Sequence, residues 1–276
     1  MSLLASQENA LRNVRERALP RLASLRAGLI ERLGVSAGQL DATAVHLRDR
    51  APVIVQFRPE REPPLGGPPL VDSLLADPVY RNQYETMTTT GTFAPFPGQC
   101  RDEWERALFG GAYHEGELIP AERPKYGGFF ALATPGGSSC WSYGRCFFQL
   151  RHEVKRRTTF CPVDSSYCGP EQVCTIDTWE VLLDLVAWLD PDFARDVVTV
   201  AGGGRLEQVR QYRGSFIEAQ VHGTLDLRRD VECVVIGTEF VSTQWEGKLL
   251  ELAELVGAPV RYTDRLRYLS REEALV

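Results

Sequence analysis

Two short segments place a tyrosine next to glycines, a combination that suits the binding of a flat ligand. Residues 109–113 read Phe-Gly-Gly-Ala-Tyr, and residues 123–127 read Arg-Pro-Lys-Tyr-Gly. Glycine has no Cβ, so a ligand can approach the backbone closely at these positions. Tyr113 and Tyr126 are therefore candidates to stack on a charged, partly aromatic cofactor. The alternative is that both are ordinary half-buried residues of a sheet.

A glutamate in a later segment is the candidate for the chemistry itself. Residues 215–222 read Ser-Phe-Ile-Glu-Ala-Gln-Val-His, and strand alternation places Phe216, Glu218 and Gln220 on one face. A carboxylate flanked by apolar residues is costly unless it has partners, so Glu218 is either a functional acid or an exposed strand residue. We expect His222 on the opposite face of the strand, as a structural histidine.

Two arginines, Arg58 and Arg61, follow the first convincing strand of the chain. The end of a buried strand is a usual place for a guanidinium that binds phosphate or fixes a ribose. These arginines are therefore candidates for the anionic side of the same ligand.

The same segments, in this order, resemble those of the ADP-ribosyltransferases. In the poly(ADP-ribose)-polymerase-like branch, a Phe-Gly-x-Gly-x-Tyr strand and a second tyrosine enclose the nicotinamide, and a late glutamate holds the nicotinamide-side ribose. Residues 109–113 resemble the first tyrosine element, one residue shorter, and residues 123–126 resemble the second. Residues 143–150 are similar to the strand that follows in that branch.

A closer resemblance is to a bacterial effector family, the CteC-type transferases that ADP-ribosylate ubiquitin on threonine. Its pattern recurs in order over residues 53–240, which is far more specific than any single motif. The matching segments are residues 58–61, 80–86, 104–105, 109–113, 123–127 and 217–223. The sequence departs from the family at Arg58, where a histidine is expected, whereas Arg61 keeps the family's position.

The resemblance implies a fold, an activity and two partners. The expected fold class is α+β, with an ADP-ribosyltransferase-like split mixed β-sheet core and peripheral helices. The expected activity is NAD-dependent mono-ADP-ribosylation of a threonine hydroxyl of ubiquitin, with release of nicotinamide. One alternative is an NAD-consuming toxin or a transferase with another protein or nucleic-acid target. Another is a non-catalytic module that binds ubiquitin or NAD.

By the same resemblance, the candidate residues have distinct roles toward NAD. Arg61, together with Arg58, would anchor the phosphates and the adenosine side. Tyr113 and Tyr126 would stack on the nicotinamide ring. Glu218 would bond the ribose, stabilise the cationic centre that develops when the glycosidic bond breaks, and take the proton of the acceptor hydroxyl.

Three further polar side chains are secondary candidates. By the resemblance, Gln220 and the hydroxyls of Thr88 and Thr89 would position the acceptor and contact the ribose. A threonine hydroxyl is a poor nucleophile at neutral pH, so the reaction would depend on a nearly dissociated electrophile held close to it.

The composition excludes several classes of protein. A net charge of -6 and a pI near 5.4 argue against a general nucleic-acid binder, although the basic residues 151–157 are suited to a small anion. Charges interrupt every apolar run well short of the ~18 residues that a membrane span needs. No apolar segment of a signal peptide follows the N-terminus, so we expect synthesis in a cytoplasm and export only by a route that does not use such a signal. The resemblance to the bacterial effectors implies that this is a bacterial cytoplasm and that the protein is delivered into a host cell.

No metal site is expected. The seven cysteines show no Cys-x-x-Cys pair, and Cys161, Cys168 and Cys174 are more widely spaced than zinc ligands usually are. None of the four histidines is paired at i, i+4. The cysteines are therefore read as reduced and mostly buried thiols.

The pattern of apolar residues divides the chain into an N-terminal helical segment, residues 1–50, that packs on the core, and a catalytic domain, residues 51–276. Helical spacing covers residues 3–33, with an interruption at Pro20 and a stop at Gly34. Further helices are predicted at residues 71–84, with a break near Pro78, at 104–109, at 179–189, with a capping box at 177–180, and at 244–256. Strands are predicted at residues 53–57, 129–133, 143–150, 158–161, 197–200, 216–222, 231–236 and 260–262.

Overall fold

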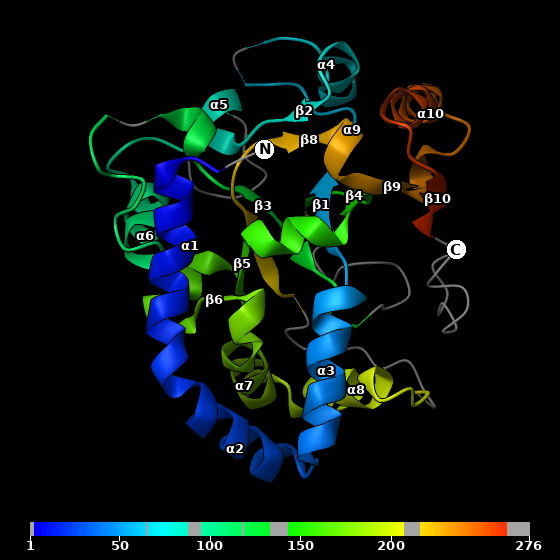
Figure 1. Cartoon of the computed structure of the whole chain (residues 1–276). Coiled ribbons are helices and arrows are strands. Elements are labelled where there is room, and N and C mark those ends of the chain that lie inside the picture. The colour runs from blue at the N-terminus through cyan, green and yellow to red at the C-terminus, as the bar shows by residue number, and fades with distance from the viewer. Residues whose placement is uncertain are drawn as a thin grey trace.

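Three helices open the chain and form one side of the molecule (Figure 1). The computed structural model describes residues 3–64, 66–87, 95–117, 119–132, 143–206 and 216–263. The opening helices are α1 (Ala5–Ala18), α2 (Leu22–Leu33) and α3 (Ala37–Asp49). As predicted, Pro20 interrupts the helical run, because it lies in a 3-10 turn, and Gly34 ends α2 with a left-handed backbone. The third helix lies within the predicted helical segment of residues 1–50, although no separate helix is predicted after Gly34.

A mostly antiparallel sheet of eight strands forms the centre of the fold. Its strand order is β10-β9-β4-β1-β3-β7-β5-β6, and of these neighbours only β10 and β9 run parallel. The bounds in that order are Val260–Tyr262, Val231–Ile236, Cys146–Leu150, Val53–Phe57, Lys125–Phe129, Glu218–Val221, Thr158–Cys161 and Cys174–Thr175. A separate pair joins β2 (Val79–Tyr80) to β8 (Leu225–Asp226).

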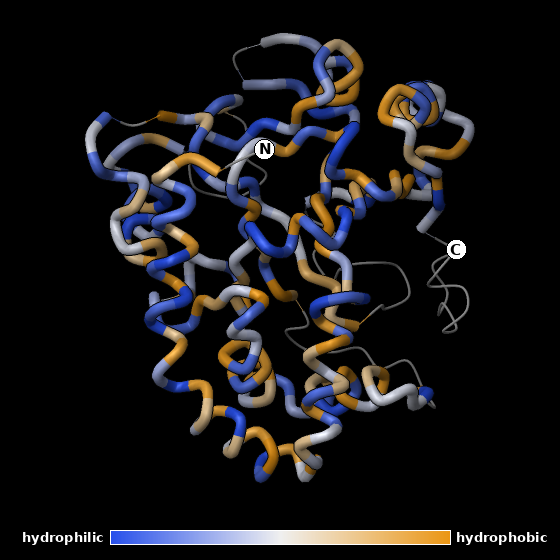
Figure 2. Tube along the Cα trace, viewed as in Figure 1, coloured by the Kyte–Doolittle hydropathy of each residue, from blue (hydrophilic) through white to orange (hydrophobic). Residues whose placement is uncertain are grey.

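Helices surround this sheet, so the expected α+β class is confirmed. The remaining helices are α4 (Leu70–Ala76), α5 (Gln83–Thr86), α6 (Cys100–Leu108), α7 (Trp179–Leu189), α8 (Pro191–Ala201), α9 (Leu227–Asp230) and α10 (Gln244–Val256). α2 packs against α7 and α3 against α8, while α10 packs against α4 and β9. Hydrophobic and hydrophilic stretches alternate along α1 and α2 in Figure 2, as expected when one helix face is buried.

One hydrophobic core joins the N-terminal helices to the sheet. Leu29 and Leu47 are fully buried in the same cluster as Phe57 and Phe148, whose rings stack with centroids 4.4 Å apart. At the end of α3, the buried ammonium of Lys155 donates hydrogen bonds to the carbonyl oxygens of Leu47 and Ala51. Apolar contacts therefore pack the N-terminal helices onto the sheet, and the hydrogen bonds from Lys155 satisfy carbonyl groups at the end of α3 that have no partner within the helix.

The strand predicted at residues 197–200 is wrong, because this segment belongs to α8. Its valines are β-branched and favour strands, but buried positions recur at helical spacing through Phe193, Val197 and Ala201. The side chain of Asp190 accepts a hydrogen bond from the Phe193 N–H and so caps the helix. Tertiary packing along one helix face therefore outweighs local strand propensity.

Two helix predictions also change in detail. The break predicted near Pro78 in the helix of residues 71–84 is observed, but β2 lies between the two helical parts. α4 ends at Ala76, and α5 begins after Asn82, whose side chain accepts from the N–H groups of Tyr84 and Glu85. The predicted capping box at residues 177–180 is absent, because a 3-10 turn precedes α7 and no side chain caps it. Within the described ranges, no helix has both the length and the apolar character that a membrane span requires.

Candidate functional site

A cavity of about 180 Å³ opens between β3, β7, α6 and the turn that follows β5. Its lining includes Tyr126 and Gly127 on β3, Phe216 and Glu218 at the start of β7, Arg101 and Trp104 on α6, and residues 164–167 after β5. The remaining lining residues are Gln56, Tyr80, Gln83 and Tyr143. This volume is smaller than the roughly 300–1,000 Å³ of sites that take a whole drug-sized ligand, and it suits one ring and its neighbouring group.

The sheet register brings the candidate residues to one face. Tyr126 pairs with Gln220 across β3 and β7, and Gly128 pairs with Glu218. Residues directly opposite each other in antiparallel strands project to the same side. Tyr126, Gln220 and Glu218 therefore share the face that borders the cavity, as alternation along residues 216–220 predicted for the last two.

The glycines of the two tyrosine motifs are explained by the fold. A Cβ on Gly127 would lie 2.1 Å from the carbonyl oxygen of Ile54, so β1 and β3 approach too closely for any side chain. Gly110 and Gly111 have φ values of 62° and 77°, and a Cβ on Gly110 would lie 2.9 Å from Asn13 on α1. These positions need glycine for backbone conformation and packing, whether or not a ligand approaches.

Glu218 is the buried acid of the cavity. Its side chain is 5% exposed, and the amide of Gln220 donates a hydrogen bond of 2.8 Å to its Oε1. Burial raises the pKa of the Glu218 carboxyl to about 7, while hydrogen bonds from Ser165 and Gln220 act against this rise and the nearby charge of Asp164 adds to it. A carboxyl that titrates near neutrality in a cavity is suited to proton transfer and to stabilising a cation.

This raised pKa predicts an unusual dependence of stability on pH. Between about pH 4.5 and 7 the folded chain holds a proton on Glu218 that the unfolded chain has lost. The contribution of this group to the free energy of unfolding is therefore lost as pH rises through this range, and the loss is complete above about pH 7. The variant Glu218→Gln removes that loss. Its stability relative to wild type should rise by about 2 kcal/mol between pH 5 and pH 8 in urea unfolding experiments. A pH-independent difference would contradict the raised pKa.

A chain of hydrogen bonds runs away from Glu218 into the interior. Gln220 accepts from the Thr159 hydroxyl at 2.8 Å, Thr159 Oγ1 lies 3.1 Å from His222 Nε2, and His222 Nδ1 lies 2.5 Å from the Tyr113 hydroxyl. Since Thr159 donates to Gln220, its oxygen accepts from His222 Nε2–H, and His222 Nδ1 accepts from Tyr113. Each proton in this chain therefore points toward Glu218, which fixes the orientation of the Gln220 amide.

The placement of His222 differs from the prediction. It contacts Thr159, as Gln220 does, so it lies on the same side as Gln220 and Glu218 rather than the opposite one. Burial, together with the charges of Lys125 and Arg157, lowers the pKa of His222 to about 3, so its ring is neutral at physiological pH. Its structural role agrees with the sequence prediction.

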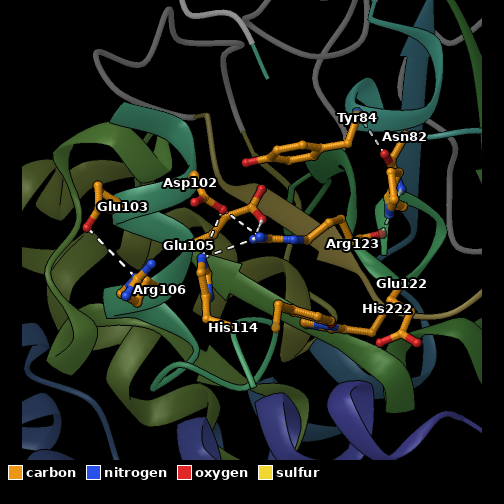
Figure 3. Close-up of polar contacts among 12 residues, drawn as sticks. Asn82, Tyr84, Asp102, Glu103, Glu105, Arg106, His114, Glu122, Arg123 and His222 are labelled. Atoms are coloured by element: carbon orange, nitrogen blue, oxygen red, sulfur yellow. Dashed lines mark hydrogen bonds and ion pairs between the residues drawn. The ribbon is translucent and has the colours of Figure 1, made fainter. Parts of the chain in front are cut away.

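Tyr126 is held in the cavity wall by a second polar network. Its hydroxyl donates a hydrogen bond of 2.7 Å to Glu105 of α6, and Glu105 accepts a second hydrogen bond, of 2.8 Å, from the guanidinium of Arg123. Figure 3 shows Arg123 directed between Asp102 and Glu105, with His114 against Asp102. Arg123 is 1% exposed and Glu105 is fully buried, so the tyrosine of the cavity rests on a buried ion network.

The structure does not bring every predicted residue to this cavity. Tyr113 is buried, bonded to His222 and outside the lining. Arg58 and Arg61 are exposed and do not line the cavity. Thr88 and Thr89 lie outside the described residues.

Arg101 and Ser165 are among the lining residues that sequence reasoning missed. Ser165 lies in a turn with no motif, and Arg101 resembles any surface arginine of an amphipathic helix. It is only 7% exposed, and its guanidinium lies 5.2 Å from the ring centre of Tyr126 and 5.5 Å from that of Trp104. In the described part of the chain, no cluster of three or more potential metal ligands is found.

The fold is α+β, and its cavity contains Glu218, a buried glutamate with a pKa of about 7, together with the rings of Tyr126 and Trp104. The family profile described as "Protein of unknown function (DUF3626)" matches residues 52–270. The chain therefore belongs to the DUF3626 family, whose profile begins one residue before β1 and leaves α1, α2 and α3 outside. A comparison with curated proteins finds no match.

Proposed function

We propose that this protein is an NAD-dependent mono-ADP-ribosyltransferase that transfers ADP-ribose to a threonine hydroxyl of ubiquitin. The observation that carries the proposal is the convergence of Glu218 and Tyr126 on one cavity, with a carboxyl whose pKa burial raises to about 7. These are the acid and one of the two phenols that the resemblance to the effector family assigns to the reaction. In this proposal the sheet is an ADP-ribosyltransferase-like core within residues 51–276.

The proposed reaction breaks the bond between ribose C1′ and the nicotinamide nitrogen, and the bonding electrons leave with neutral nicotinamide. The oxygen of the acceptor threonine forms the new bond to C1′, and its proton passes to Glu218. As a carboxylate, Glu218 also stabilises the positive charge that develops on the ribose. Its pKa near 7 allows both the ionised state and proton acceptance at physiological pH.

The remaining cavity residues have supporting roles in this proposal. Tyr126 offers a ring face for the nicotinamide, and its hydroxyl is already bonded to Glu105, so the ring is fixed before a ligand binds. Gln220 is fully buried and acts through Glu218, as a positioning residue. The cavity volume suits the nicotinamide and its ribose, with the adenosine part of the dinucleotide outside it.

The test is incubation of the protein with ubiquitin and NAD labelled in the adenosine part. The proposal expects nicotinamide release together with label on ubiquitin, mapped to threonine by mass spectrometry. Nicotinamide release without labelled ubiquitin would point to an NAD-consuming toxin or to another protein or nucleic-acid acceptor. Absence of turnover, with ubiquitin or NAD still bound, would instead favour a binding module. Production in a bacterium and delivery into a host cell are part of the proposal, because the acceptor is a host protein.

A further inference from the structure

Among the described residues, Arg101 is a buried cation that forms no ion pair, although its charge opposes the rise in the pKa of Glu105. Its side chain is 93% buried, lines the cavity and lies on α6, one turn before Glu105. Within the described ranges, no carboxylate is within ion-pair distance of it and its Nε has no hydrogen-bond partner. Asp102, the next residue, and Glu105, one turn further along the helix, both pair with Arg123 instead. A buried guanidinium in this state is costly, and binding of an anion would offset the cost.

The surroundings of Arg101 leave its hydrogen-bonding edge for a ligand. The rings of Tyr126 and Trp104 lie 5.2 Å and 5.5 Å from the guanidinium carbon, within the range of cation–π contact. Such contact uses the face of the planar group and leaves the N–H groups along its edge, which match the oxygens of phosphate. The side-chain Oε1 of Gln83, also in the cavity lining, is buried without a partner among the described residues. The wall therefore offers both a charged donor and an amide that a ligand would satisfy.

We propose that Arg101 binds a phosphate group of the ligand that enters this cavity. The inference deepens the proposed function, on which it rests for the identity of the ligand as NAD. The cavity then carries opposite charges suited to the two parts of NAD, with Glu218 and Asp164 for the cationic nicotinamide ribose and Arg101 for a phosphate. This role replaces Arg58 and Arg61, which the sequence favoured, since neither lines the cavity.

The test measures binding of ADP-ribose by calorimetry, which needs no turnover. Arg101→Gln should weaken the affinity by about 10- to 100-fold, the factor for losing a hydrogen bond between charged groups. Arg101→Lys, which keeps the charge and loses the planar fork, should fall between wild type and Arg101→Gln. The matched controls Arg58→Gln and Arg61→Gln should bind ADP-ribose as wild type does. Nicotinamide, which carries no phosphate, should bind wild type and Arg101→Gln equally.

The outcomes separate this inference from the proposed function. Equal binding of ADP-ribose by wild type and Arg101→Gln would overturn the inference and leave the proposed function standing. Loss of binding in Arg58→Gln or Arg61→Gln alone would also overturn it and restore the sequence prediction. If wild type binds neither ADP-ribose nor NAD, the proposed function is overturned. In that case, inorganic pyrophosphate serves as the probe. If wild type binds pyrophosphate and Arg101→Gln does not, Arg101 remains a phosphate site for another ligand. If wild type does not bind pyrophosphate either, or if Arg101→Gln binds it equally, the inference about Arg101 is overturned together with the proposed function.

Discussion

Replacing Glu218 by glutamine is expected to lower the rate of nicotinamide release by about 10³-fold while the fold is retained. The substitution keeps the shape of the side chain and an oxygen that accepts from Gln220. In the proposed reaction, it removes the negative charge that stabilises the ribose cation and the site that receives the acceptor proton. Initial rates with labelled NAD, with and without ubiquitin, measure the effect, and circular dichroism checks the fold.

Two matched variants sharpen the reading of this experiment. Glu232→Gln makes the same change on β9, where the residue accepts a hydrogen bond from Gln149 and does not line the cavity, and should leave the rate unchanged. Asp164→Asn changes the other acid of the lining. Full activity in Glu218→Gln combined with its loss in Asp164→Asn would transfer the catalytic role to Asp164. Because the ionised carboxyl is the active form in the proposed reaction, we expect wild-type kcat/KM to rise with pH through about 7.

The sequence located the acid and one aromatic residue of the cavity because both depend on local rules. Alternation along β7 places Glu218 and Gln220 together, and a short motif identifies Tyr126 as a candidate. The strand that carries Tyr126 was predicted wrongly at residues 129–133, whereas β3 spans Lys125–Phe129. The same alternation, applied through to position 222, would have placed His222 correctly. The large strands and most helices follow from apolar spacing for the same reason, that a buried face repeats with the period of its element.

The sequence could not reveal which polar groups satisfy one another across the fold. Tyr113 has the composition of a stacking residue, but its hydroxyl is committed to His222, which lies 109 positions away. Arg101 and Arg123 are both arginines near the same helix, yet one pairs with two acids and the other faces the cavity. That difference arises from the tertiary path of the chain between α6 and β3, and no motif records it.

Replacing Arg123 by methionine is expected to destabilise the fold by about 3–5 kcal/mol, since it leaves two buried carboxylates without their partner. Burial raises the pKa of Glu105, and the charge of Arg123 opposes that rise. At Asp102 burial also favours protonation, but the Gly98 N–H and Arg123 outweigh it, so its pKa lies below the usual value. Urea unfolding at neutral pH measures the loss.

An exposed ion pair on α6, the helix that carries Asp102 and Glu105, provides the control for Arg123→Met. Arg106 lies 3.9 Å from Glu103, both side chains are more than half exposed, and Figure 3 shows the pair beside the Arg123 network. Arg106→Met should cost at most about 0.5 kcal/mol, because solvent screens an exposed pair. A loss in Arg123→Met no larger than this would show that the buried pairs do not hold the fold.

The pH dependence of the loss identifies its electrostatic origin. The lowered pKa of Asp102 contributes stability that is present above its unfolded value and is lost as pH falls through the folded value. The difference between wild type and Arg123→Met should therefore shrink toward pH 4, where the carboxylates take up protons. Adding Glu105→Gln to Arg123→Met should recover part of the loss, because an amide still accepts from Tyr126 without carrying a charge. Recovery of stability together with a Tyr126 ring that still faces the cavity would link the buried ion network to the site it supports.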